Sequence, residues 1–243
     1  MQHIAIFGAS GAIGRAFCDC LAIAYPNATI HAIARKPPAF SHPHIVPHQL
    51  DFDDELAIAA LIKAISSTQA LDSVIVTIGL LHDSKPDAQP IAPEKSLRDI
   101  TADQLHQYFH VNALLPMMIA KYALPALNKS SQSLFAVLSA RVGSISDNRL
   151  GGWYGYRMAK ASLHMGIKNL SIELQRKNPN AIIVALHPGT VDSELSKPFQ
   201  KNVAEGKLFS PAFSAQSLLK VLHQLTPKDS GKIWAWDGKE IMP

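Results

Sequence analysis

A short apolar run near the start of the chain opens directly into a glycine-rich turn. The run is His3–Phe7, and the turn reads Gly8-Ala9-Ser10-Gly11-Ala12-Ile13-Gly14 before a helical stretch from Arg15. The free N–H groups and positive dipole end of such a helix attract an anion, and glycines let a pyrophosphate approach the backbone closely. The pattern therefore favours a strand, a phosphate-binding turn and a helix over an ordinary strand-to-helix turn.

Strands and helices alternate along the rest of the chain. Apolar runs predict further strands at Ala28–Ala34, Ile45–Leu50, Ser73–Ile78, Leu134–Leu138 and Ala181–Leu186. Helical patterns lie between them at Asp54–Ile65, from Thr101 through Asn112, and at Tyr156–Gln175. Because alternating strands and helices require parallel pairing and right-handed crossovers, we expect an α/β protein with a doubly wound Rossmann fold. Its parallel sheet should have about seven strands, flanked by helices.

Length and composition fit one domain. The 243 residues suffice for a single doubly wound unit with a large core, and no glycine- or serine-rich linker, repeat or low-complexity tract divides them. We expect residues 1–243 to form a single nucleotide-binding Rossmann domain.

Several classes of protein are disfavoured. The longest apolar stretch, Ala113–Ala126, is interrupted by Pro116, Lys121 and Pro125, so we expect no membrane span. The chain begins directly with a strand and lacks the pattern of a secretory signal, which predicts a cytoplasmic location. The net charge of +4 comes from scattered basic residues, so we expect no binding of nucleic acid.

The cysteines and histidines give no metal pattern. Cys18 and Cys20 lie two apart in the first helix and should point to different sides, as reduced thiols. His42, His44 and His48 share a proline-containing loop, but no carboxylate or cysteine stands at metal-ligand spacing beside them. We expect a solvated loop there and no metal site.

Tyr156 and Lys160 lie four residues apart on a predicted helix, and that spacing puts both side chains on one face. A lysine charge beside a phenol favours the phenolate, which lowers the pKa of the tyrosine toward the range where it exchanges protons near neutrality. An amphipathic helix with the tyrosine at the core edge and the lysine in water has the same spacing. The rest of the chain favours the catalytic interpretation.

Other landmarks accompany this pair in chain order: Leu50-Asp51-Phe52, Gly79, Val111-Asn112-Ala113, Ser139 at the end of the fifth strand, and Pro188-Gly189-Thr190-Val191-Asp192-Ser193. With the glycine turn they resemble the short-chain dehydrogenase/reductase family over nearly the whole chain. The segments Leu138–Ile145 and Gly151–Arg157 look most similar to its C-factor-like and carbonyl-reductase-like branch.

The resemblance implies a role for each matching residue. Tyr156 would be the acid that protonates a carbonyl oxygen as hydride arrives, or the base in the reverse direction. Lys160 would lower the tyrosine pKa and hold the nicotinamide ribose, and Asn112 would support a water that passes protons to the lysine, unless it is a structural amide within a helix. The implied nucleotide-binding residues are Gly8, Ser10, Gly11, Ala12, Ile13, Gly14, Asp51, Phe52, Gly79, Lys160, Pro188, Gly189, Val191 and Ser193.

The chain departs from the family pattern in three places. Its glycines follow the spacing Gly-x-x-Gly-x-x-Gly, and Val76-Thr77-Ile78-Gly79 replaces the usual Asn-Asn-Ala-Gly. Where the family has Ser-Ser, with the second serine polarising the carbonyl, this chain has Ser139-Ala140. Ser139 could take that role by a shift at the strand end, Ser144 could enter from the loop, or neither serine touches the substrate; we favour Ser139.

The second strand ends Ile33-Ala34-Arg35-Lys36, without the acidic residue that would bond a ribose 2′-hydroxyl. Arg35 can pair with a 2′-phosphate in a bidentate manner, so the sequence favours NADP(H) over NAD(H), although a solvated basic pair is the alternative. Asp51 and Phe52 would then flank the adenine, with Asp51 accepting from its amino group.

The expected function is NADP(H)-dependent hydride transfer between nicotinamide and a small carbonyl or secondary alcohol substrate. The alternative is a C-factor-like nucleotide-binding protein that signals without turnover. Substrate choice would depend on the loops Leu81–Pro93, Ser146–Trp153 and Lys197–Ser210. The resemblance also implies a homodimer or homotetramer, paired through helices at Thr101–Leu127 and Tyr156–Gln175.

Overall fold

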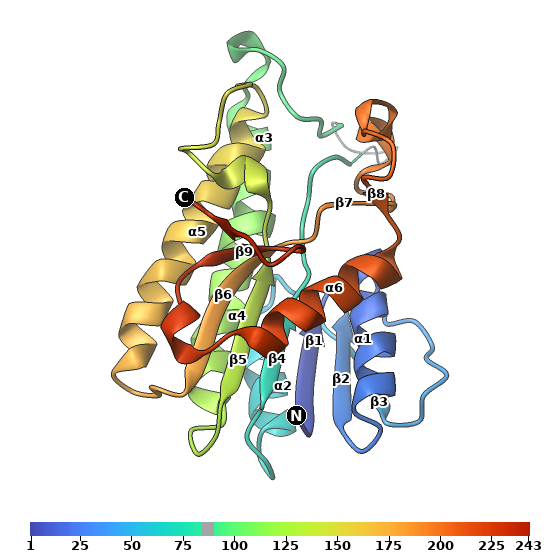
Figure 1. Ribbon diagram of the computed structural model, residues 1–243, viewed down its shortest axis with the longest axis vertical. Coiled ribbons are helices and arrows are strands. Elements are labelled where there is room, and N and C mark those ends of the chain that lie inside the picture. Colours follow the sequence, from blue (N-terminus) through green and yellow to red (C-terminus); the bar gives the residue numbers. More distant parts are fainter. Residues whose placement is uncertain (84–89) are drawn as a thin grey trace.

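The computed structural model describes residues 1–83 and 90–243. Within them, one eight-stranded sheet runs through the centre in the order β10-β9-β6-β5-β4-β1-β2-β3 (Figure 1). Neighbouring strands pair in parallel, except that β10 runs antiparallel to β9. The direction of winding reverses between β1 and β4, and doubly wound sheets bind ligands at the carboxyl ends of the strands beside that reversal.

The strands of the sheet are β1 (His3–Phe7), β2 (Thr29–Ala34), β3 (Ile45–Gln49), β4 (Ser73–Val76), β5 (Ser133–Leu138), β6 (Ala181–His187), β9 (Ile233–Ala235) and β10 (Glu240–Ile241). The α-helices are α1 (Ala12–Ala24), α2 (Glu55–Ile65), α3 (Ala102–Phe109), α4 (Leu115–Ala123), α5 (Tyr154–Gln175) and α6 (Pro211–Gln224). Two short strands, β7 (Thr190–Val191) and β8 (Leu208–Phe209), pair separately.

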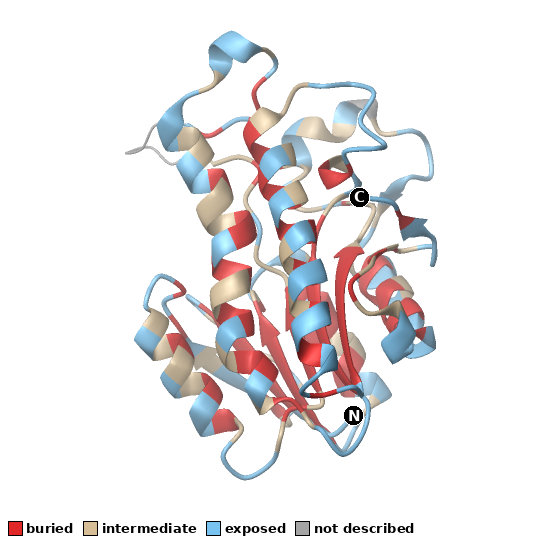
Figure 2. Cartoon of the chain, turned by 90° about the vertical axis from the view of Figure 1, so that its left-hand side faces the viewer, coloured by how far each residue is buried: buried red, intermediate tan, exposed pale blue. Residues whose placement is uncertain are grey.

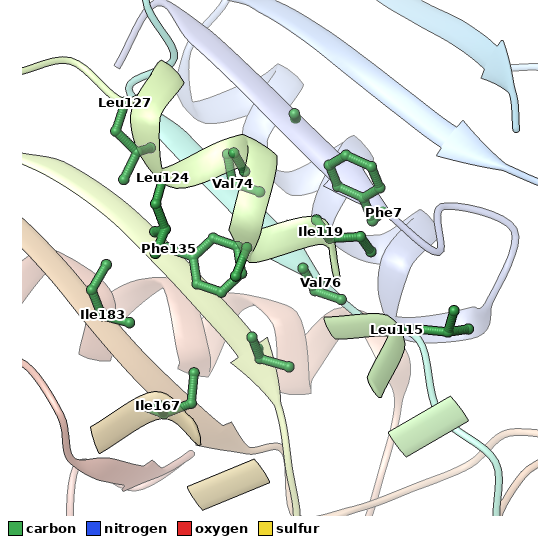
Figure 3. Close-up of a cluster of buried hydrophobic side chains, with 14 of the residues drawn as sticks. Phe7, Val74, Val76, Leu115, Ile119, Leu124, Leu127, Phe135, Ile167 and Ile183 are labelled. Atoms are coloured by element: carbon green, nitrogen blue, oxygen red, sulfur yellow. The ribbon is translucent and has the colours of Figure 1, made fainter. Parts of the chain in front are cut away.

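Helices cover both faces of the sheet, and a buried apolar cluster lies under each layer. The cluster under α2, α4 and α5 includes Phe7, Phe135 and Ile167 (Figure 3). The opposite cluster, under α1 and α6, includes Phe17 and Leu218. The inner strands β1, β2, β4, β5 and β6 are buried almost throughout, the edge strand β3 is largely exposed, and the helices present an exposed face outward (Figure 2). Burial on both faces explains why the strands read as continuous apolar runs.

The structure confirms the predicted doubly wound Rossmann sheet. Most predicted boundaries differ by one or two residues, as cap residues such as Asp54 fall outside the assigned helix. The helix expected from Thr101 through Asn112 continues further: α3 passes through a π-helical turn at His110–Leu114 into α4. Among the described residues, no helix is both long and apolar enough to cross a membrane.

The histidines are arranged differently from the solvated loop that we expected. His48 lies in β3, and its Nε2 is 2.8 Å from Nδ1 of His31, whose Nε2 is 2.7 Å from Nε2 of the buried His3. The pattern of alternate residues on parallel strands places these three rings on one face of the sheet. In residues 1–83 and 90–243, no group of three or more His, Cys, Asp or Glu side chains could hold a metal ion.

Candidate active site

The turn after β1 is shaped by two glycines that admit no side chain. A Cβ on Gly14 would lie 2.3 Å from the carbonyl oxygen of Gly8, and Gly8 itself has a φ of +92°. Thr77, which follows β4, donates from Oγ1 to the carbonyl oxygens of Phe7 and Gly8 at 3.0 and 3.1 Å. The turn is therefore held tightly against β4, and α1 begins beside it.

Two cavities meet at this turn. One, of about 390 Å³, is lined by the turn, by Tyr156 and Lys160 of α5, and by the segment after β6. The other, of about 280 Å³, extends from the turn to Arg35, Phe52 and His110. Both share Ser10, Gly11, Thr77, Ile78 and Gly79 in their walls. Since the glycines in these walls carry no side chain, the backbone of the turn directly borders the groove that the two cavities form.

The structure brings most of the predicted site residues to this groove. The lining residues that we predicted are Gly8, Ser10, Gly11, Ala12, Ile13, Gly14, Arg35, Phe52, Gly79, Ser139, Tyr156, Lys160, Pro188 and Ser193. In the described chain, Asp51, Asn112, Ser144, Gly189 and Val191 are not part of either lining.

Tyr156 and Lys160 lie on one face of α5, as their spacing predicts. Both are buried, and Lys160 Nζ lies 5.7 Å from the centre of the Tyr156 ring. The lysine donates to the carbonyl oxygen of Leu138 at 3.1 Å, which ties α5 to the end of β5. Tyr108 and Trp153 approach the Tyr156 ring edge-on, with ring centres 6.1 and 6.2 Å away.

The pKa values of these two residues differ from the expectation that Lys160 lowers the pKa of Tyr156. Burial raises the pKa of Tyr156 well above its usual value, and burial lowers the pKa of Lys160 from 10.5 to about 7. The lysine is therefore only partly charged near neutrality, and its ammonium group lies over the phenol ring. In this environment desolvation outweighs the lysine charge, so Tyr156 is held as a protonated acid.

The end of β5 carries its two candidate serines in different surroundings. Ser139 Oγ lies 2.7 Å from Nε2 of His164 on α5, and both residues are buried. Ser144 donates from Oγ to the Met242 carbonyl oxygen and accepts from the Asp147 amide at 3.1 Å. Only Ser139 of the two lines the cavity with Tyr156.

Ala140 occupies the position where the family's second serine is expected. Its side chain packs against the apolar cluster that contains Tyr108, Tyr156 and Ala159. Ser139 and Ala140 both approach α5, but Ser139 reaches His164, whereas Ala140 packs in the apolar cluster around Tyr156. The methyl group there supplies no hydrogen bond.

Asn112 sits within the π-helical turn between α3 and α4. Its side-chain amide donates to the carbonyl oxygens of Leu80 and Tyr108 at 2.8 and 3.1 Å and accepts from the Leu80 amide at 3.1 Å. These bonds join the helix to the segment after β4. They match the structural alternative for this residue.

The far end of the groove differs from the expected adenine site. Phe52 and Asp53 line it, whereas Asp51 is exposed and accepts from the Asp53 amide at 3.1 Å. Asp53 in turn lies 2.5 Å from Nε2 of His110. The Asp51 carboxylate thus accepts a hydrogen bond within its own turn, which the sequence pattern did not reveal. Arg35 is exposed and lines the same cavity.

The segment after β6 turns at Gly189, whose φ is +77° and whose Cβ would lie 2.6 Å from the Phe209 ring. Val191 is buried in β7, and Ser193 faces the groove. Further on, Phe199 packs on Trp153 with ring centres 5.1 Å apart. The loop Lys197–Ser210, one of those expected to determine substrate specificity, thus reaches the start of α5. In the loop Leu81–Pro93, residues 84–89 lie outside the described residues.

Sequence reasoning missed several contributors. Thr77 departs from the family pattern, and its hydroxyl group secures the glycine turn. His164 could have been found from its spacing, since it lies one helical turn beyond Lys160 on the same face. The contact of Asp53 with His110 joins segments 57 residues apart, and no local pattern predicts it.

Comparison with known proteins shows which family the chain resembles. The family model for short chain dehydrogenases matches residues 2–204. The C-signal protein of Myxococcus xanthus is 31% identical over 146 residues, which cover 60% of this chain and 82% of that protein. A protein named 1-hydroxy-2-glutathionyl-2-methyl-3-butene dehydrogenase, from a Rhodococcus species, is 32% identical over 136 residues, or 56% of this chain and 57% of its own length.

A similar fold occurs among solved structures. The NADPH-bound carbonyl reductase from chicken fatty liver superposes with a TM-score of 0.85 and 22% identity, covering 100% of this chain and 94% of its own. At that identity the likeness concerns the fold.

Proposed function

The chain belongs to the short-chain dehydrogenase family, and from that premise we propose that it is an NADP(H)-dependent reductase of small carbonyl compounds. In the reverse direction it would oxidise secondary alcohols. The observation that carries the proposal is that Tyr156 and Lys160 line the same cavity as the glycine turn. A proton donor and a pyrophosphate site thus share one groove, as hydride transfer to a carbonyl group requires.

The residues of the groove fit a dinucleotide. The glycine turn and the first N–H groups of α1 would hold the pyrophosphate, because Gly8 and Gly14 leave no room for a Cβ and Gly11 caps the helix without a side-chain hydrogen bond. Val191 and Ser193 would hold the carboxamide, and Lys160 the ribose. When bound, the nicotinamide supplies or accepts the hydride.

The residues of this chain manage the proton. The raised pKa of Tyr156 keeps its hydroxyl group protonated, so in reduction it donates that proton to the carbonyl oxygen as the carbonyl carbon gains the hydride. Lys160, with its pKa lowered by burial, would gain charge beside a phenolate and stabilise it. Ser139 would polarise the carbonyl group through a hydrogen bond, in place of the serine that Ala140 lacks.

Arg35 supports a preference for NADP(H). Its guanidinium borders the groove at the end of β2, and no acidic residue stands at that strand end to repel a 2′-phosphate. The relative from chicken liver is described as NADPH-bound, which agrees with this choice.

An oligomer built on α4 and α5 is also part of the proposal. The π turn before α4 and the outer side of α5 expose large apolar side chains: Leu114, Met158, Met165 and Ile172. An apolar hollow of about 770 Å³, bordered by Phe109, Val111 and Met117, lies beside them. A homodimer would cover both.

The test is consumption of NADPH and NADH with a panel of ketones and aldehydes, alongside direct titration of nucleotide binding. We expect turnover with at least one carbonyl compound and a preference for NADPH. The similarity to C-signal favours a second candidate, a nucleotide-binding signalling protein. Tight binding of NADPH with no oxidation across the whole panel would support that candidate and refute the reductase.

A further inference from the structure

A buried imidazole lies directly behind the candidate polarising serine. His164 is 4% exposed and so is Ser139, and the His164 Nε2 atom lies 2.7 Å from Ser139 Oγ. Tyr156, Lys160 and His164 follow one another at intervals of four residues along α5, so the histidine continues the stripe that carries the proposed acid. His164 itself does not line the groove, and Ser139 stands between them.

His164 is held in place from two sides. Gly143 packs so closely on α5 that a Cβ there would lie 2.8 Å from His164 Cε1 and 2.7 Å from Lys160 Cβ. The Ser139 hydroxyl closes the other side. The ring therefore has little freedom to rotate, and its Nε2 stays aimed at the serine.

The protonation state of the ring decides which way this hydrogen bond runs. Burial and the nearby Lys160 lower the pKa of His164 to about 4, so the imidazole is neutral and carries one N–H. Its Nδ1 is buried and has no hydrogen-bond partner among the described residues. A buried N–H without a partner is rarer than a buried acceptor without one. The proton therefore belongs on Nε2, which donates to Ser139 Oγ.

A serine that accepts a hydrogen bond from behind has its own hydroxyl hydrogen free. That hydrogen can turn toward the groove, and a chain of two bonds running in the same direction strengthens the outer one. The opposite tautomer would have Ser139 donate to the ring and leave nothing for a substrate. The direction of this one bond thus determines whether Ser139 can act.

We infer that His164 is a positioning residue, which holds the Ser139 hydroxyl with its hydrogen toward the substrate carbonyl oxygen and so replaces the serine missing at Ala140. The inference rests on the proposed reductase function. It explains how a chain with Ala140 could keep a polarising hydroxyl group, since Ser144 is bound to Met242 and Asp147.

The test compares three changes at His164 and Ser139. Ser139→Ala should lower kcat by about 10²-fold, the scale of a lost oxyanion donor. His164→Leu should lower kcat by at least about tenfold, while the KM for NADPH stays within about twofold, and combining it with Ser139→Ala should add no further loss. His164→Gln, whose amide N–H reaches as far as Nε2, should recover most of the activity.

A rescue experiment separates positioning from folding. In the His164→Leu protein, Ala140→Ser places a hydroxyl group directly beside Tyr156 and should restore kcat at least tenfold, which a merely structural role for the histidine would not allow. The control Lys168→Leu changes an exposed residue one turn further along α5 and should leave kcat within about twofold. Losses that simply add in the double variant, or a rescue that fails while NADPH still binds, would overturn the inference.

A measurement independent of turnover distinguishes this inference from the proposed function. Nitrogen NMR of labelled histidine should show His164 as the Nε2–H tautomer near neutral pH, with a resonance that shifts in Ser139→Ala. The Nδ1–H tautomer would refute the positioning role even in an active enzyme. The Nε2–H tautomer in a protein that oxidises no NADPH would instead leave the pair intact and refute the reductase.

Discussion

The turn after β1 and the end of β5 border the same cavity, but they hold their functional groups by different means. In the turn, the backbone itself is the functional group, and the spacing of Gly8 and Gly14 leaves 2.3 Å between the Gly8 carbonyl oxygen and a Cβ at Gly14. At the end of β5, a hydroxyl group must be aimed, and a second side chain on α5 aims it.

The difference concerns what each region can tolerate. A turn defined by steric exclusion fails when any side chain is added, whatever the pH or the neighbouring residues. The end of β5 depends on a pair of side chains. It can therefore lack the usual serine at position 140 and keep a hydroxyl group from the preceding residue, Ser139. The second region should therefore respond to conservative changes and to pH, and the first should not.

The largest effect should come from the acid that both regions serve. Tyr156→Phe removes the transferable proton and keeps the ring, so kcat should fall by about 10²- to 10⁴-fold while the affinity for NADPH changes only a few-fold. Tyr108→Phe is the matched control, because that phenol donates to the Leu81 carbonyl oxygen at 2.7 Å and does not line the groove. Steady-state kinetics with nucleotide titration would measure both, and an active Tyr156→Phe protein would refute the assignment.

The glycine turn should show the next largest effect. Gly14→Ala forces a Cβ against the Gly8 carbonyl oxygen and Thr77, so the affinity for NADPH should fall by about 10²-fold and the free energy of unfolding by about 1–3 kcal/mol. Gly11→Ala meets nothing closer than 3.4 Å and should leave the free energy of unfolding within about 1 kcal/mol. Equal stability of the two variants would show that steric exclusion does not define the turn.

Arg35 tests a part of the groove that depends on a charged side chain, and not on steric exclusion or on a pair of hydrogen-bonded side chains. Arg35→Asp should exchange a phosphate contact for repulsion, and the preference for NADPH over NADH should drop by about tenfold or more. Lys36→Asp makes the same charge change one residue away, outside the groove lining, and should alter the preference far less. Ratios of kcat/KM for the two nucleotides decide this. A wild-type preference for NADH would contradict the proposed contact between Arg35 and a 2′-phosphate.

A further effect is a pH dependence confined to the β5 side. Folding lowers the pKa of Lys160 from 10.5 to about 7, so below pH 10.5 the unfolded chain takes up a proton that the folded chain takes up only near 7. The free energy of unfolding should therefore decrease as the pH falls between these values, by at most about 1.4 kcal/mol per pH unit, and level off below 7. Denaturant unfolding of wild type and Lys160→Met between about pH 7.5 and 9.5 would isolate this contribution. Parallel curves would contradict it.

The sequence predicted the first region better than the second for a physical reason. Glycines at fixed spacing have few alternatives, so Gly8 and Gly14 reveal the turn, and unbroken apolar runs reveal strands buried on both faces. Ser139 could be singled out, but its partner His164 is 25 residues away, and the spacing that puts His164 on the same face of α5 as Lys160 does not indicate that it meets Ser139. Likewise, the Asp51 carboxylate turned out to serve its own backbone turn, a choice that depends on local geometry and leaves no mark on the pattern.

The pKa of Tyr156 likewise depends on structure that the sequence pattern does not reveal. The spacing of Tyr156 and Lys160 predicts that they are neighbours, and they are, but the sign of the shift depends on how deeply α5 is buried. Burial is a property of the whole fold. A motif therefore predicts which groups meet more reliably than it predicts their charge.

The most direct test of the account follows the hydride itself. Wild-type protein would be given NADPH that carries deuterium at both hydrogen positions of the transferring carbon of the nicotinamide, with a carbonyl compound that it reduces, and the product would be analysed by mass spectrometry. We predict one deuterium on the carbinol carbon for each nucleotide oxidised. Oxidised nucleotide with no label in the product, or bound nucleotide that stays reduced with every carbonyl compound offered, would contradict hydride transfer at this site.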